Sequence, residues 1–239
     1  AQLSSFHTSL VAAGLGENRA LLLAPDIDVA LRWIDHTTGL VGAQQVSVCD
    51  LRAESAIVGH ARRPRSGHLT AVTAHGYPGL GVSRLDERLG RRVLARATHN
   101  GPPASRHPAL LARVRTDCAE ARTTMRTTSL RIDVEAPSTR QIKKHDVTLH
   151  SDDIFQLARP HSAEIVRALQ RCTAPGTTPD RVLLIGSAPT FPLLADAVVT
   201  RFGCPVIMPD DPDFVCARGA ALLAAAAPNP AQPQAGSLQ

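Results

Sequence analysis

The last third of the chain constrains the fold most, because its apolar segments alternate between strand and helix patterns. A buried strand is expected over residues 181–186, where Arg-Val-Leu-Leu-Ile-Gly ends in a glycine. A helix over 191–202, a short strand over 206–208 and a helix over 211–226 follow. Alternation of this kind favours a parallel sheet whose strands are joined by crossover helices. The sequence therefore predicts an α/β fold.

The rest of the chain adds strands first and then helices. The arginine-rich stretch 62–67 is expected to be a solvated turn between two strands. The other expected strands are 20–23, 45–50, 55–61, 69–75, 130–135 and 139–149. The other expected helices are 5–13, one opened by Pro25, 83–97, 108–127, and one that has Ser151 as its N-cap and is broken near Pro160.

Composition bounds the partners that such a chain can have. The five cysteines are odd in number and have no close spacing, which is typical of reduced, buried thiols in a cytoplasmic protein. The net charge of +5 comes from arginines spread among acids with few aromatic residues, so binding to nucleic acid is not expected. No apolar run is long enough to cross a bilayer, so no membrane partner is expected. The histidines lack a pattern of acidic partners, and no metal site is expected.

Two stretches near the end carry a family resemblance. Residues 181–192, Arg-Val-Leu-Leu-Ile-Gly-Ser-Ala-Pro-Thr-Phe-Pro, resemble a strand that ends in Gly-Gly-Ser-Thr-Arg-Ile-Pro. Residues 209–221 resemble a helix with the pattern Asn-Pro-Asp-Glu-Ala-Val-Ala-Tyr-Gly-Ala-Ala. Both patterns are those of DnaK-type chaperones, the seventy-kilodalton heat-shock family. Five weaker matches precede them in the family's order, at 23–30, 49–55, 76–86, 115–125 and 149–157.

The resemblance implies the second lobe of an actin-like ATPase of the ribonuclease-H-like type, with an inserted helical and hairpin subdomain. The first lobe of the same parent protein would then lie outside this chain and would be a partner, beside other proteins not identified. The implied domains are remnant helices of the first lobe at 1–38, an α/β core at 39–79 and 158–226, the insert at 80–157, and a disordered tail rich in Pro, Ala and Gln at 227–239.

The resemblance also implies a site for ATP or ADP with magnesium in the parent protein. The residues that match the family's nucleotide contacts are Asp50, Ser55, Gly81, Arg122, Gly186, Ser187 and Asp213. A phosphate loop needs glycines, because backbone N–H groups must approach phosphate oxygens without a Cβ in the way. Here the three loop glycines are replaced by Arg52, Ala53 and Glu54. Arg122 and Arg126 lie one turn apart and would meet either a nucleotide or solvent.

Three hypotheses follow for the function. In the first, the chain is a degenerate chaperone-like lobe that does not hydrolyse ATP and acts through protein contacts. In the second, it is the ATP-contacting second lobe of a working ATPase. The third is an unrelated dinucleotide-binding fold, which is weaker because no Gly-x-Gly-x-x-Gly opens a helix after a strand. Catalytic residues are assigned in none of them, and Lys143 and Lys144 are expected to face solvent.

Overall fold

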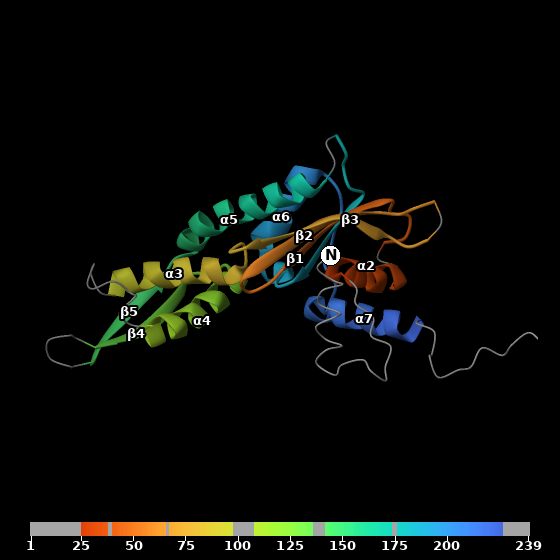
Figure 1. Ribbon diagram of the computed structural model, residues 1–239. Helices are drawn as coiled ribbons and strands as arrows, with labels where there is room; N and C mark the ends of the chain where they lie inside the picture. Colours follow the sequence, from red (N-terminus) through yellow and green to blue (C-terminus); the bar gives the residue numbers. More distant parts are fainter. Residues whose placement is uncertain are drawn as a thin grey trace, which may run out of the picture.

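The computed structural model describes residues 25–37, 40–65, 67–97, 108–135, 142–173 and 176–226. In these ranges one mixed sheet, a separate hairpin and six α-helices form an elongated α/β molecule (Figure 1). The strands are β1 Gln45–Leu51, β2 Ser55–Arg62, β3 Thr70–Pro78, β4 Thr128–Glu135, β5 Ile142–Leu149, β6 Arg181–Gly186 and β7 Val206–Ile207. The helices are α2 Asp26–His36, α3 Val82–Ala97, α4 Pro108–Thr124, α5 Ser151–Cys172, α6 Pro192–Phe202 and α7 Val215–Ala226, with 3-10 turns η2 Ala188–Thr190 and η3 Pro212–Phe214.

The main sheet has the strand order β3-β2-β1-β6-β7. β1, β2 and β3 pair antiparallel as successive neighbours, whereas β1 pairs parallel with β6 and β6 pairs parallel with β7. The alternating elements of the last third therefore do build the parallel part of the sheet, as predicted. The parallel part begins at β1, which is far away in the sequence, so the pairing itself could not be predicted from the alternation.

Helices cover both faces of the sheet. Successive strand side chains point to opposite faces, so Val182 and Leu184 enter the core under α5 and α6, and Leu183 and Ile185 enter the core under α2 and α7. Burial on both faces explains why β6 is a continuous apolar run.

The segment between β3 and α5 forms an arm that extends from one end of the sheet (Figure 1). The arm consists of helices α3 and α4 and of the antiparallel pair β4–β5. Its buried residues, such as Leu89 and Ile132, belong to the same core cluster as Leu184 of the sheet. Helix α5 runs without a break from the arm onto the sheet, so the boundary expected at 157 and 158 falls inside one helix.

Two expectations about α5 are wrong. The helix continues through Pro160, and its N-cap is His150, which forms a capping box with Asp153, so Ser151 is already helical. A proline frees the carbonyl four residues before it. Pro160 and Gln156 are both exposed, so solvent can reach this part of the helix while the opposite face stays packed.

Smaller differences concern the ends of elements. The last expected helix is split into η3 and α7. In the stretch expected to be a solvated turn, the guanidinium of Arg63 donates two hydrogen bonds to Asp35, at 2.7 and 3.0 Å. Cys49, Cys118 and Cys172 are free and buried, as expected, whereas Cys204 and Cys216 are partly exposed. The elements expected at 5–13 and 20–23 and the tail at 227–239 lie outside the described residues.

Two buried histidines lead us to expect that the free energy of unfolding decreases at acidic pH. His60 and His161 are buried, and the Nε2 atom of each has no hydrogen-bond partner among the described residues. Burial lowers the pKa of both. Arg62 adds to this at His60, and at His161 the positive charges of Arg84 and Arg88 add to it while Glu164 opposes it. Below about pH 6.5 the unfolded chain therefore binds more protons than the folded chain. As the pH decreases, the free energy of unfolding then falls, by up to about 1.4 kcal/mol per pH unit for each histidine.

Urea unfolding of the natural chain and of His161→Leu at several pH values between 7 and 5 checks this. The raised pKa values of Asp50 and Asp86 act in the opposite direction over part of this range. The informative quantity is therefore the difference in pH slope between the two chains. Equal slopes would show that His161 titrates normally in the folded protein.

Candidate functional site

The carboxyl ends of the parallel strands β1 and β6 bring three of the expected site residues together. Asp50 pairs with Ile185 in the register, and Leu51 pairs with Gly186. The backbone N–H of Ser187 then donates to the carbonyl of Leu51 at 2.6 Å. Asp50, Gly186 and Ser187 therefore lie at one edge of the sheet, where ligands bind in many open α/β sheets.

Acidic groups surround Asp50 at this edge. Its side chain is 8% exposed. Burial raises the pKa of its carboxyl, and the negative charges of Asp26 and Asp213 raise it further, against the opposing effect of Arg52. Asp26 begins α2, and Asp213 lies in η3, which follows β7 after four residues. The expected residue Asp213 therefore lies close enough to Asp50 to influence its protonation.

Arg52 neutralises part of this acidic edge. Its Nε donates to Asp50 Oδ2 at 2.8 Å, and its Nη2 forms an ion pair with Asp26. Hydrogen bonds to both acids raise the pKa of Arg52, although burial acts against this. A guanidinium thus occupies the space between two carboxylates at the position where the resembled family has a phosphate-loop glycine.

Ser55 and Gly81 lie beside the same loop, in its tight contact with the start of α3. The turn between β1 and β2 closes with Arg52 N–H donating to Ser55 O at 2.8 Å. The N–H groups of Val82 and Ser83 donate to the carbonyls of Arg52 at 3.1 Å and Ala53 at 2.9 Å. Free N–H groups at a helix N-terminus can bind anions, but these two already bind the loop.

Packing within the protein accounts for both matched glycines. A Cβ at Gly186 would lie 2.5 Å from Leu51 O and 2.7 Å from Asp50 Oδ1, and its φ of +64° is in the left-handed region. A Cβ at Gly81 would collide with the carbonyl of Ala53. These glycines are therefore needed by the fold, whether or not a ligand approaches them.

Arg122 is placed in the arm, away from solvent. It is 4% exposed, and its Nε donates to Asp86 Oδ1 at 2.7 Å between α4 and α3. Burial raises the pKa of Asp86, and Arg122 opposes this rise. The alternative of a solvated face is therefore wrong for Arg122, whereas Arg126 is exposed. Lys144 is exposed as expected, and the side chain of Lys143 lies outside the described residues.

The loop between β1 and β2 differs from one that binds the phosphates of a magnesium nucleotide. The described residues contain no group of three or more His, Cys, Asp or Glu residues that could hold a metal ion by themselves, and Mg²⁺ on a nucleotide needs only one or two carboxylates. The loop that would need free N–H groups is occupied by Arg52, with side chains at Ala53 and Glu54 and with its carbonyls bound to α3. The edge has the position of a ligand site, and three of its charged groups, Arg52, Asp50 and Asp26, bind one another there.

The sequence pattern missed two residues that shape this geometry. Asp26, in the first turn of α2, is the second partner of Arg52. Asp86 lies directly after Leu85 on the buried side of α3 and pairs with Arg122. The sequence contains an indication of the second pair, because residues 86 and 122 each directly follow an apolar position of their helix and could therefore lie at the buried side.

No helix in the described part of the chain is long and apolar enough to cross a membrane, in line with the expectation from sequence.

Among curated proteins none matches the chain. Residues 112–235, more than half of the chain, match DUF7159, a family of unknown function; the match runs from within α4 to beyond α7. The chain therefore belongs to the DUF7159 family.

Proposed function

We propose that this chain is a degenerate lobe of a DnaK-type, actin-like ATPase domain, which does not hydrolyse ATP and acts through contacts with other proteins. The sheet supports the lobe assignment: three antiparallel strands are followed by an insert and then by two parallel strands on the other side of β1. The arm between β3 and α5 also supports it, because the resemblance implies an inserted subdomain after the third strand.

The position of Arg52 is the main support for the proposal that the chain does not hydrolyse ATP. Its guanidinium lies on Asp50 and Asp26, where a phosphate-binding loop would present backbone N–H groups to a ligand. Charge at this position can favour an anion, but it cannot supply the free backbone donors that such a loop needs. Stabilisation of a transferred phosphoryl group also needs preorganised cations, and Arg52, the cation at this edge, is held in ion pairs with Asp50 and Asp26.

Titration of the chain with ATP and magnesium in a calorimeter tests the proposal. We expect no saturable heat up to millimolar nucleotide and no release of phosphate. Arg52→Ala is the companion variant, because it removes the guanidinium and leaves the backbone unchanged. Micromolar binding with magnesium-dependent phosphate release by the natural chain would overturn the proposal.

The second candidate, an ATP-contacting lobe of a working ATPase, is favoured by one observation. Asp50, Gly186, Ser187 and Asp213 do converge at a single edge of the sheet. Under this alternative the natural chain binds nucleotide, and Asp213→Asn weakens that binding at least about tenfold, which corresponds to about 1.4 kcal/mol. The exposed Asp196→Asn on α6 is the matched control, and it should have no effect.

A further inference from the structure

Helix α3 carries four arginines at a constant spacing of four residues. We call Arg84, Arg88, Arg92 and Arg96 the arginine ladder. Residues four apart lie above one another on one face of a helix, so successive rungs are about 6 Å apart along the axis. Like charges at this spacing destabilise a helix. The ladder therefore needs compensating negative charge.

Among the described residues, ion pairs compensate the last two arginines of the ladder. Asp153 of α5 accepts hydrogen bonds from both terminal nitrogens of Arg96, and it forms an ion pair with Arg92 at 3.0 Å. Arg92 also donates to Gln156 Oε1 at 3.2 Å. These contacts fix the two last rungs against the start of α5.

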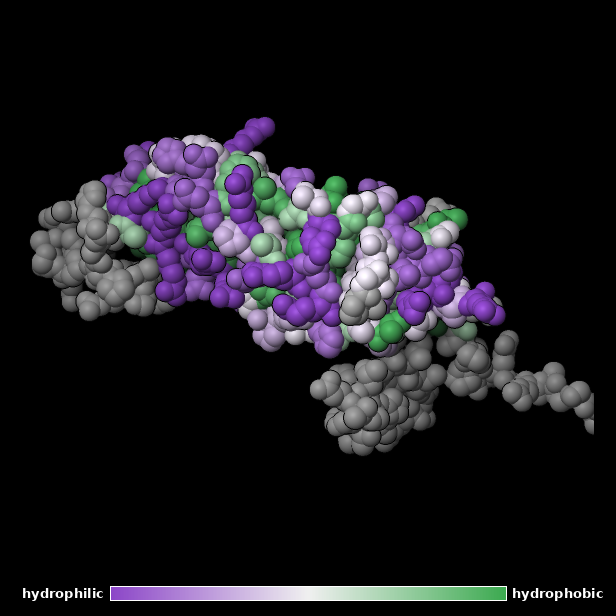
Figure 2. All heavy atoms as spheres, turned by 90° about the horizontal axis from the view of Figure 1, so that it is seen from above, coloured by the Kyte–Doolittle hydropathy of each residue, from purple (hydrophilic) through white to green (hydrophobic). Residues whose placement is uncertain are grey.

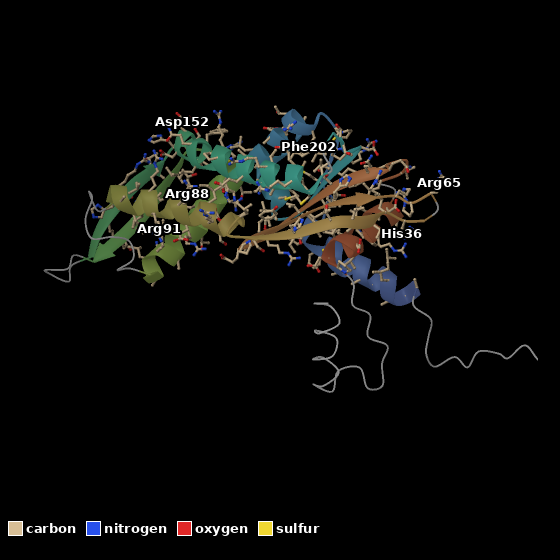
Figure 3. All side chains as sticks on the ribbon, turned by 45° about the horizontal axis from the view of Figure 1, so that its top comes forward. His36, Arg65, Arg88, Arg91, Asp152 and Phe202 are labelled. Atoms are coloured by element: carbon tan, nitrogen blue, oxygen red, sulfur yellow. The ribbon has the colours of Figure 1, made fainter. Side chains whose placement is uncertain are left out.

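The first two rungs remain open. Arg84 and Arg88 are exposed. Arg84 donates to the carbonyl of Gly79 at 3.2 Å, and Arg88 has no hydrogen bond or ion pair among the described side chains. Figure 3 shows Arg88 on α3, with Arg91 one turn further along and Asp152 at the start of α5. Two guanidinium groups therefore keep unused donors on the arm.

An open pocket adjoins the ladder through Gln156. Its volume is about 570 Å³, and it is lined by Asp152, Phe155, Gln156, Arg159 and Pro160. The guanidinium of Arg159 lies 5.8 Å from the centre of the Phe155 ring. Aromatic and arginine side chains of this kind often carry the binding energy of protein interfaces. Hydrophilic side chains gather over the arm half of the face seen in Figure 2.

We propose that the arginine ladder and the Phe155 pocket bind an extended acidic peptide segment of a partner protein. Alternate side chains of an extended chain are about 6.6 to 6.8 Å apart, which is close to the spacing of the rungs. Acidic residues at alternate positions would meet Arg84, Arg88 and the free donors of Arg92, and an apolar side chain would enter the pocket. This proposal rests on the proposed function, because it names the kind of partner that the lobe contacts.

A nucleic-acid strand fits this surface less well. Glu87, Asp152 and Glu164 lie among the arginines of α3 and α5 and would repel a continuous line of phosphates. In a peptide of alternating acidic residues, the positions between the acids are free to avoid or pair with them. The pocket beside Gln156 also suits a side chain better than a sugar-phosphate backbone.

Fluorescence anisotropy with a labelled peptide tests the proposal. The probe alternates Asp with Ser and ends in Leu, and the control peptide has Asn in place of Asp. We expect saturable binding of the acidic peptide alone, weaker at about 200 mM than at about 50 mM salt because the contacts are exposed. The double variant Arg84→Gln/Arg88→Gln should lose at least about tenfold in affinity, with an unchanged or higher midpoint of thermal unfolding.

Arg167→Gln is the matched control, because Arg167 is exposed on α5 and donates only to the carbonyl of Ala163 in its own helix. Equal loss in this variant, no binding of the acidic peptide, or tighter binding of a single-stranded RNA of equal charge would overturn the proposal. Absence of peptide binding together with absence of ATP binding leaves the proposed loss of ATPase activity standing. Conversely, binding and hydrolysis of ATP would contradict the proposed loss of ATPase activity, whereas the affinity for the acidic peptide would still test the peptide site.

Discussion

Gly219→Val is expected to unfold the protein or to lower its free energy of unfolding by about 3 kcal/mol or more, because overpacking against a backbone cannot be relieved by a rotamer change. Gly219 is buried where α7 crosses α2, and a Cβ at this position would collide with the carbonyl of Val29. The two helices cover one face of the sheet together. Separating them to make room would expose that core.

Urea unfolding followed by circular dichroism measures the effect. Ala220→Val is the matched control, because Ala220 is the next residue of the same helix and is exposed. It adds the same side chain to the same helix without the collision. By helix propensity alone Ala220→Val costs a few tenths of a kcal/mol, whereas Gly219→Val would gain a few tenths, so propensity cannot explain a larger loss at Gly219. Similar losses in both variants would mean that α2 and α7 do not pack as closely as described.

Arg122→Met is expected to destabilise the protein by about 3 to 5 kcal/mol, because it leaves a buried carboxylate without its partner. The carboxyl of Asp86 is buried, and its pKa is already raised by burial in the presence of Arg122. Without Arg122 the pKa rises further, so the folded variant binds more protons than the unfolded chain at mildly acidic pH. The stability of Arg122→Met should therefore fall as the pH increases.

The double variant Asp86→Leu/Arg122→Met should recover most of the lost stability, since replacing both partners of a buried pair by apolar groups is often neutral. Arg131→Met is the control for a solvent-exposed pair. Arg131 lies 3.1 Å from Asp146, and both side chains are more than 70% exposed, so its loss should change stability by no more than about 1 kcal/mol. A loss for Arg122→Met as small as that for Arg131→Met would show that the Asp86 pair is not buried in solution.

Local patterns predicted the elements well where the period was strong. The strands around Cys49, Val58 and Leu184 and the helices around Leu89 and Leu194 lie where expected. The prediction of a break at Pro160 failed because packing along α5 outweighs one missing hydrogen bond. For the site, the sequence indicated Asp50, Gly186 and Asp213, and strand pairing brings the first two together.

By itself, the sequence determined the α/β class, the order of strands and helices, and a turn after the first strand of the sheet that has Arg52, Ala53 and Glu54 and no glycine. Only the tertiary structure decided what these residues do. The partners Asp26 with Arg52, and Asp86 with Arg122, are 26 and 36 residues apart. A helical or strand period relates a residue only to near neighbours, so pairs at such separations form when packing fixes both ends. The turn that resembles a phosphate loop is thereby closed by its own arginine, and the arginine expected at the nucleotide is buried in the arm.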